Sequence, residues 1–209
     1  MRARELLTEA KNPHISHIED LVFDRGYAGA VESLKLATGV RNMLSKGRGK
    51  RGKVTVKFDG APAIFAGIDP ADGKFFVGGK AVFSKNPKMI KSLNDIKKFY
   101  TGAPEGFTTK IEAAFIHLKK LGIKNVLQGD LMFIDDMLTH QNIGGQDYIV
   151  FTPNTITYAV EAGSELATQI ERAKFGIVFH TAYIGGETLS QAEKTFDIDI
   201  SGLKKTPDV

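Results

Sequence analysis

The fold of this chain is predicted most directly by the stretch Val54-Thr55-Val56-Lys57-Phe58-Asp59-Gly60-Ala61-Pro62-Ala63. Its β-branched start predicts a strand in which the two valines lie on one face and Thr55 and Lys57 on the other. The Asp59-Gly60 pair predicts a turn that returns the aspartate toward the same opening. We therefore expect the strand to present Lys57 to a pocket with Asp59 beside it, although an ordinary hairpin with a lysine at its end would share this pattern.

The chain after this turn predicts a β-hairpin. Two apolar runs, residues 64–67 and 75–77, are separated by Asp69-Pro70-Ala71-Asp72-Gly73, whose proline and glycine favour a turn. The second run leads directly to Lys80. We expect Lys57 and Lys80 to face one cleft.

A basic run precedes the predicted strand. Residues 46–53 read Lys-Gly-Arg-Gly-Lys-Arg-Gly-Lys, with five cations and no acid. The three glycines favour a mobile loop over a helix end, and the lack of aromatic residues favours phosphate contacts over base stacking. We expect nucleic-acid phosphates to be bound by Lys46, Arg48, Lys50 and Arg51, the alternative being a solvated linker.

Composition excludes several classes of protein. The 209 residues include no cysteine and only five scattered histidines, so disulfides and thiolate metal sites are excluded and a structural zinc site is disfavoured. No segment resembles a signal peptide or a membrane span, which predicts a cytoplasmic protein that does not bind membranes. The net charge of +4 is compatible with a partner that carries phosphates.

The order of the predicted elements indicates an α+β fold with a largely antiparallel sheet. Two helices separated by Gly26 come first, followed by strands up to residue 83 and a lysine-rich, mostly helical connection over 84–102. We predict further helices at 109–121 and 164–174, and further strands at 125–133, 147–152, 156–160 and 176–183. The expected organisation is an N-terminal part, residues 1–52, and a core, residues 53–209. No Gly-x-Gly-x-x-Gly follows a predicted strand, and the P-loop and Gly-x-Ser-x-Gly fingerprints are absent from the sequence.

Three segments resemble motifs of the covalent nucleotidyltransferases, the superfamily of ATP-dependent DNA ligases, RNA ligases and mRNA capping enzymes. Lys57-Phe58-Asp59-Gly60 is similar to the motif whose lysine attacks the α-phosphate of the nucleotide. Gly79-Lys80-Ala81-Val82-Phe83-Ser84-Lys85 is similar to the next, basic element, and Gln128-Gly129-Asp130 to the strand that contacts the ribose. The whole chain is also similar to proteins of tailed phages with the same lysine motif, for which the compartment would be the host cytoplasm.

The resemblance implies a fold, a reaction and a set of site residues. The fold would be the ligase-like core of two antiparallel sheets that flank the nucleotide, and the cofactors would be ATP and Mg²⁺. Lys57 would form the lysyl-nucleotide with Asp59 as the second catalytic residue, and Asp130 would also contact the metal. The nucleotide would be bound by Gly60, Lys80, Gly129, Asp130 and His180.

The chemistry and two departures from the motifs leave two functions open. A lysine normally has a pKa of about 10.4, and lowering it to about 8 requires roughly 3 kcal/mol, which burial and neighbouring cations can supply. Asp130 stands where the superfamily usually has glutamate, and Phe175 stands where an acid precedes the glycine of the fourth motif. The first function is an ATP-dependent ligase-like enzyme acting on RNA or DNA ends. The second is a nucleic-acid-binding or assembly module that keeps the fold without catalysis.

Overall fold

The computed structural model describes residues 18–46 and 56–209, and the chain divides into two compact units, Met1–Lys57 and Phe58–Val209. In the first unit the described part is one helix, α1 (Asp20–Lys46). Gly26 interrupts it with φ 55° and ψ −129°, a conformation that glycine adopts easily. The break predicted at Gly26 is therefore confirmed. Beyond this break, the Leu21 carbonyl packs so closely on Gly29 that a Cβ at Gly29 would not fit.

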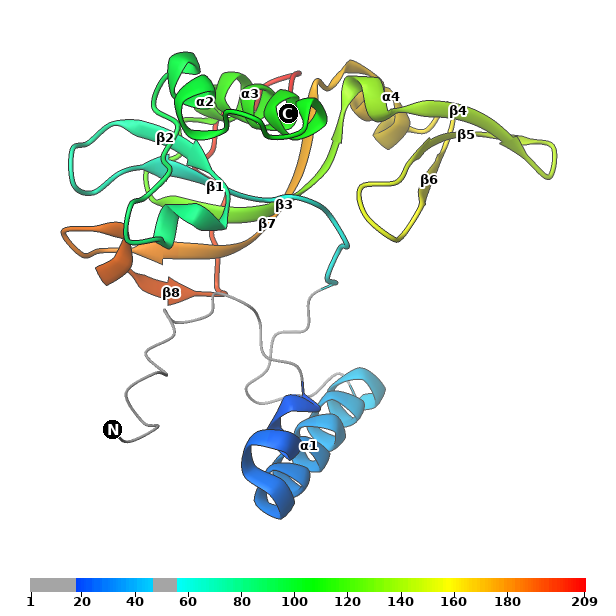
Figure 1. Cartoon of the computed structure of the whole chain (residues 1–209). Coiled ribbons are helices and arrows are strands. Elements are labelled where there is room, and N and C mark those ends of the chain that lie inside the picture. Colours follow the sequence, from blue (N-terminus) through cyan, green and yellow to red (C-terminus); the bar gives the residue numbers. More distant parts are fainter. Residues whose placement is uncertain (1–17, 47–55) are drawn as a thin grey trace. The chain divides into compact units, whose positions relative to one another are not determined.

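The second unit contains eight strands in two antiparallel sheets, coloured from cyan to orange in Figure 1. The larger sheet has the order β2-β1-β3-β7-β8, and the smaller has the order β4-β5-β6. The strands are β1 (Ala63–Ile68), β2 (Phe75–Gly78), β3 (Val126–Ile134), β4 (Thr139–Ile143), β5 (Gln146–Phe151), β6 (Tyr158–Glu161), β7 (Phe175–Ile184) and β8 (Glu193–Thr195). The predicted α+β class with two antiparallel sheets is confirmed.

Helices fill the connections between these strands. They are α2 (Leu93–Phe99), α3 (Glu105–Leu118) and α4 (Glu165–Arg172), with short 3₁₀ turns η1 (Lys80–Phe83), η2 (Lys119–Leu121), η3 (Asp135–Met137) and η4 (Leu189–Gln191). Gly122, at φ 66°, ends the α3–η2 segment as predicted, and Ser164 caps α4 by accepting a hydrogen bond from the Ala167 N–H.

The large sheet separates two parts of the core. On one face, Ile111, Phe115 and Leu118 of α3 pack in one cluster with Ile64 and Leu131 of the sheet. The opposite face is covered by a second cluster, Phe65, Phe76, Val82, Val126, Tyr183 and Leu189. A third cluster joins β3 to β5 and α4. Because β3 contributes to all three clusters, its nine residues are almost wholly buried, and its polar members lie in a protected environment.

Candidate functional site

The described part of the lysine motif contains no strand. Val56 to Gly60 have no regular secondary structure, and β1 begins only at Ala63. The prediction of a strand up to Lys57 is therefore wrong for its described end, while residues 53–55 lie outside the described part. The physical reason is pairing: the first backbone hydrogen bond to β3 is made by the Ala61 N–H, which donates to the Leu131 carbonyl at 3.0 Å. Strand propensity without a neighbouring strand does not form a ladder. Lys57 itself is exposed.

Asp59 is held by the loop between β5 and β6. Its carboxylate accepts hydrogen bonds from Asn154 Nδ2 at 3.0 Å and from the Thr155 N–H at 3.1 Å. Its own N–H donates to the Tyr158 hydroxyl at 2.7 Å. The neighbouring Phe58 ring lies 5.9 Å from the Tyr158 ring. These contacts fix the motif to the smaller sheet, and the only local signal for them in the sequence is the turn dipeptide Pro153-Asn154.

Gly60 lies directly against Asp130. A Cβ at Gly60 would come within 2.6 Å of the Leu131 carbonyl oxygen and 2.8 Å of the Asp130 Cβ. The Leu131 N–H donates to the Pro62 carbonyl at 3.1 Å, and Ala63 then pairs with Asp130 across β1 and β3. Only glycine permits this close approach. The glycine of the lysine motif is therefore packed on the strand of the third motif.

A β-bulge brings His180 to the same place. Gln128 pairs with Thr181 and Gly129 with Phe179, so His180 is the extra residue on β7. Its Nε2 lies 3.6 Å from Asp130 Oδ1, and its Nδ1 lies 2.8 Å from Thr181 Oγ1. Gly129 is confined as tightly as Gly60, since a Cβ there would lie 2.6 Å from the Val178 carbonyl oxygen. The structure thus brings together Gly60 from the segment before β1, Gly129 and Asp130 from β3, and His180 from β7.

Buried polar groups extend the site along β3 and β7. Gln128 is 6% exposed and Thr181 is fully buried. The Tyr183 hydroxyl donates to Gln128 Oε1 at 2.9 Å, and burial raises the pKa of Tyr183 to about 12. Thr181 and Tyr183 were not predicted from the sequence, and Gln128 was quoted there only as part of the Gln128-Gly129-Asp130 motif. The available signal was a glutamine within the apolar run of β3, since buried polar groups need partners.

Lys80 begins η1, two residues after β2 ends. The predicted hairpin is confirmed: β1 and β2 pair antiparallel, with Phe65 opposite Gly78, around the turn at residues 69–73. The Ala63 carbonyl oxygen lies 3.9 Å from the position that a Cβ on Gly79 would take, and Ala63 is the residue paired with Asp130. Lys80, the next residue after Gly79, therefore comes directly after the end of the sheet where Gly60 meets Asp130. Its side chain is exposed.

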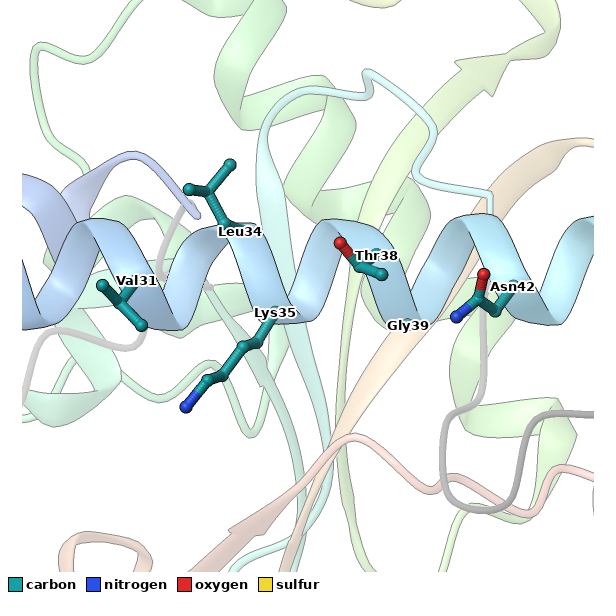
Figure 2. Close-up of a pocket in the computed structure, with 6 residues that line it drawn as sticks. All are labelled: Val31, Leu34, Lys35, Thr38, Gly39 and Asn42. Atoms are coloured by element: carbon teal, nitrogen blue, oxygen red, sulfur yellow. The ribbon is translucent and has the colours of Figure 1, made fainter.

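Other sequence candidates lie elsewhere or outside the described residues. Arg48, Lys50 and Arg51 fall outside the described part, and Lys46 is the last residue of α1. Within the described part of that helix, an open pocket is lined by Val31, Leu34, Lys35, Thr38, Gly39 and Asn42 (Figure 2).

The described residues contain no ready-made metal centre. Over 18–46 and 56–209, no group of three or more His, Cys, Asp or Glu side chains is arranged to hold an ion. Phe175, at the place of the fourth-motif acid, is completely buried in the core, and Gly176 is packed under the Phe133 ring. Asp130 is therefore the carboxylate at this site that could contact a metal carried by a nucleotide. In the same described ranges, no helix is long and apolar enough to cross a membrane.

Comparison with known proteins places the chain in one family. Residues 12–209 match DUF6267, a family of unknown function, and the chain belongs to this family. No curated protein and no solved structure matches the chain.

Proposed function

We propose that this DUF6267 protein is an ATP-dependent nucleotidyltransferase that forms a covalent lysyl-nucleotide at Lys57 and transfers the nucleotide to the end of an RNA or DNA strand. In the first step the Lys57 amine, having lost a proton, attacks the α-phosphorus of ATP. A P–N bond forms, and the bond to pyrophosphate breaks, with pyrophosphate taking the electron pair. In the second step a terminal 5′-phosphate oxygen of the nucleic acid attacks the same phosphorus. A P–O bond forms, the P–N bond breaks, and the lysine nitrogen takes the electron pair and a proton from solvent.

The adjacency of Gly60, Asp130 and His180 carries this proposal. It joins three segments that are far apart in sequence and that each resemble, or occupy the place of, a nucleotidyltransferase motif. Lys57 precedes Gly60 by three residues, so the two Cα atoms can be no more than about 11 Å apart. A nucleotide bound near Asp130 is therefore within reach of the lysine.

Each site residue has a role that follows from its surroundings. Asp59, whose carboxylate is bound by the β5–β6 loop, would position Lys57. Asp130 and His180, side by side, would bind the ribose, and Lys80, whose side chain is exposed, would bind the phosphates. Gly60 and Gly129 would hold the motif segments together beneath the nucleotide, because neighbouring strands fill the space where their Cβ atoms would lie. Mg²⁺ bound to the phosphates would neutralise their charge, and it commonly needs only one or two protein carboxylates, which Asp130 can provide in part.

A second function is favoured by one observation, the burial of Phe175. The fourth-motif position contributes an apolar core residue and no carboxylate. A protein that binds nucleotides or nucleic acid through the same surface without forming the covalent intermediate would have this feature. The basic run at Lys46, Arg48, Lys50 and Arg51 would serve nucleic-acid binding in either case.

Covalent labelling distinguishes the two functions. The full chain is incubated with α-labelled ATP and Mg²⁺ and denatured, and label retained on the protein is measured. We expect label that survives base and is released by acid, as for a phosphoramidate, and that moves to a 5′-phosphorylated oligonucleotide when one is added. Lys57→Arg should abolish it, because arginine stays protonated and cannot attack phosphorus.

Lys74→Arg provides the matched control, since Lys74 is an exposed lysine in the β1–β2 turn. It should label like the unmodified protein. If the unmodified protein retains no label although equilibrium dialysis shows that it binds ATP, the enzymatic proposal is wrong and the binding module replaces it.

A further inference from the structure

The edge strand β4 differs from the other sheet edges of the second unit. All five of its residues are exposed, and they read Thr-His-Gln-Asn-Ile, with no Lys, Arg, Asp, Glu or Pro. Native sheets usually protect an exposed edge with such residues, with a very short strand or with a covering segment. Within the second unit no strand pairs with the outer side of β4, and Glu171 Oε1 of α4 lies 4.0 Å from His140 Nε2. In Figure 1 the β4–β5 hairpin extends away from the rest of its unit.

The other three edges are protected in recognisable ways. The outer side of β2 is covered by Ile90, whose backbone exchanges two hydrogen bonds with Val77, at 3.0 and 2.8 Å. The edge strand β8 is only three residues long and contains Glu193 and Lys194. β6 has four residues and ends in Glu161. The unprotected state of β4 is therefore specific to that edge.

The hairpin turn determines which backbone groups of β4 are available. Gly144 and Gly145 have φ of 62° and 88°, as in a type I′ turn, and Ile143 pairs with Gln146 around them. In such a two-residue hairpin the closing pair is hydrogen-bonded, and bonded and non-bonded pairs alternate from there. His140 and Asn142 therefore direct their N–H and C=O groups away from β5, toward the open edge.

The strand is also held extended. Asn142 Nδ2 donates to Asp147 Oδ1 at 2.7 Å, and Asn142 Oδ1 accepts from the Gly145 N–H at 3.1 Å. A strand fixed in this way loses little conformational freedom when another strand pairs with it.

We infer that β4 pairs with β4 of a second copy of this chain, antiparallel and across a two-fold axis at Gln141, joining the two small sheets into one. In this register His140 of each copy lies opposite Asn142 of the other, so both outward N–H groups and both outward carbonyls of each strand are used. Thr139 lies opposite Ile143, which is 50% exposed in the single chain. The absence of charge on β4 supports a second copy as the occupant, because self-pairing then places no like charges opposite each other.

Sedimentation over a range of protein concentrations tests the pairing. We expect a reversible dimer of the full chain. His140→Pro removes an outward N–H without touching the β4–β5 ladder, and proline is tolerated at such edge positions. The variant loses two hydrogen bonds per dimer, which should raise the dissociation constant roughly tenfold or more. His140→Ala, which loses the same side chain and keeps the N–H, should dimerise like the unmodified protein.

Amide hydrogen exchange on the unmodified protein gives a second measurement in case His140→Pro does not fold. Protection of the His140 and Asn142 amides should rise with protein concentration. A monomer at all concentrations, a dimer equally strong in His140→Pro, or exchange at these two amides that does not change with concentration would each overturn the inference.

Discussion

Replacing Gly60 by alanine tests how tightly the lysine motif is packed on β3. The added Cβ would lie 2.6 Å from the Leu131 oxygen, 2.8 Å from the Asp130 Cβ and 3.0 Å from the Asp130 carbonyl carbon. Two of these three atoms are backbone atoms of a buried strand, so no flexible side-chain tip can move aside. The backbone around Gly60 must therefore shift away from β3.

The size of the effect follows from the bonds that this shift weakens. The hydrogen bonds from Ala61 to Leu131 and from Leu131 to Pro62, 3.0 and 3.1 Å long, flank the contact. Losing both costs about 2 kcal/mol, and residual overpacking adds about 1 kcal/mol or more. We expect the free energy of unfolding to fall by about 2–4 kcal/mol, and Tm by roughly 5–15 °C for a chain of this size.

Thermal and urea unfolding followed by far-ultraviolet circular dichroism measure this effect. Gly106→Ala provides the matched control, because Gly106 lies in α3 with no atom within 4 Å of its missing Cβ. That variant should be stabilised by up to about 1 kcal/mol, as alanine is the better helix former. If Gly60→Ala unfolds like the unmodified protein, the close packing of Gly60 on Asp130 is refuted, and with it the adjacency on which the proposed site rests.

Two further predictions concern charged groups outside the site. Lys91 Nζ binds the buried Asp69 carboxylate at 2.6 Å and the Asp72 carboxylate at 2.8 Å. Lys91→Met should therefore lower the free energy of unfolding, measured by urea denaturation, by about 2–3 kcal/mol. The control Lys74→Met should change it by less than about 0.5 kcal/mol. Burial lowers the pKa of His117 below its ordinary value of 6.5, so the unfolded chain binds this proton more tightly than the folded one. The stability that neutral His117 contributes is present above about pH 6.5 and is lost as the pH falls below it. In His117→Gln the urea midpoint should therefore depend less on pH between about pH 7 and pH 5. An unchanged pH dependence of the midpoint would contradict this assignment.

Local sequence signals were sufficient where the structure depends on neighbours in the chain. The break at Gly26, the turn at residues 69–73 and the helix end at Gly122 follow from backbone preferences of glycine and proline, which act within a few residues. Long apolar runs likewise predicted β3 and β7 to within about a residue at each end. The α+β class follows from the order of these elements alone.

Tertiary structure decided the elements whose pattern is weak or whose partners are distant. β4 has one apolar residue, Ile143, among five and was not predicted, and β8 is three residues long and exists because it pairs with β7. The strand predicted before Lys57 is absent at its described end because the β3 ladder meets the chain only from Ala61.

The same division holds for the candidate site. Lys57, Asp59, Lys80, Asp130 and His180 were all proposed from the sequence, because short motifs and strand ends are visible in it. That Gly60 packs on Asp130, and that His180 reaches the same aspartate, depends on the pairing of β1, β3 and β7 and on one bulged residue. Strand register and bulges are set by contacts between segments about fifty or more residues apart, and therefore only the folded chain brings Gly60, Asp130 and His180 together.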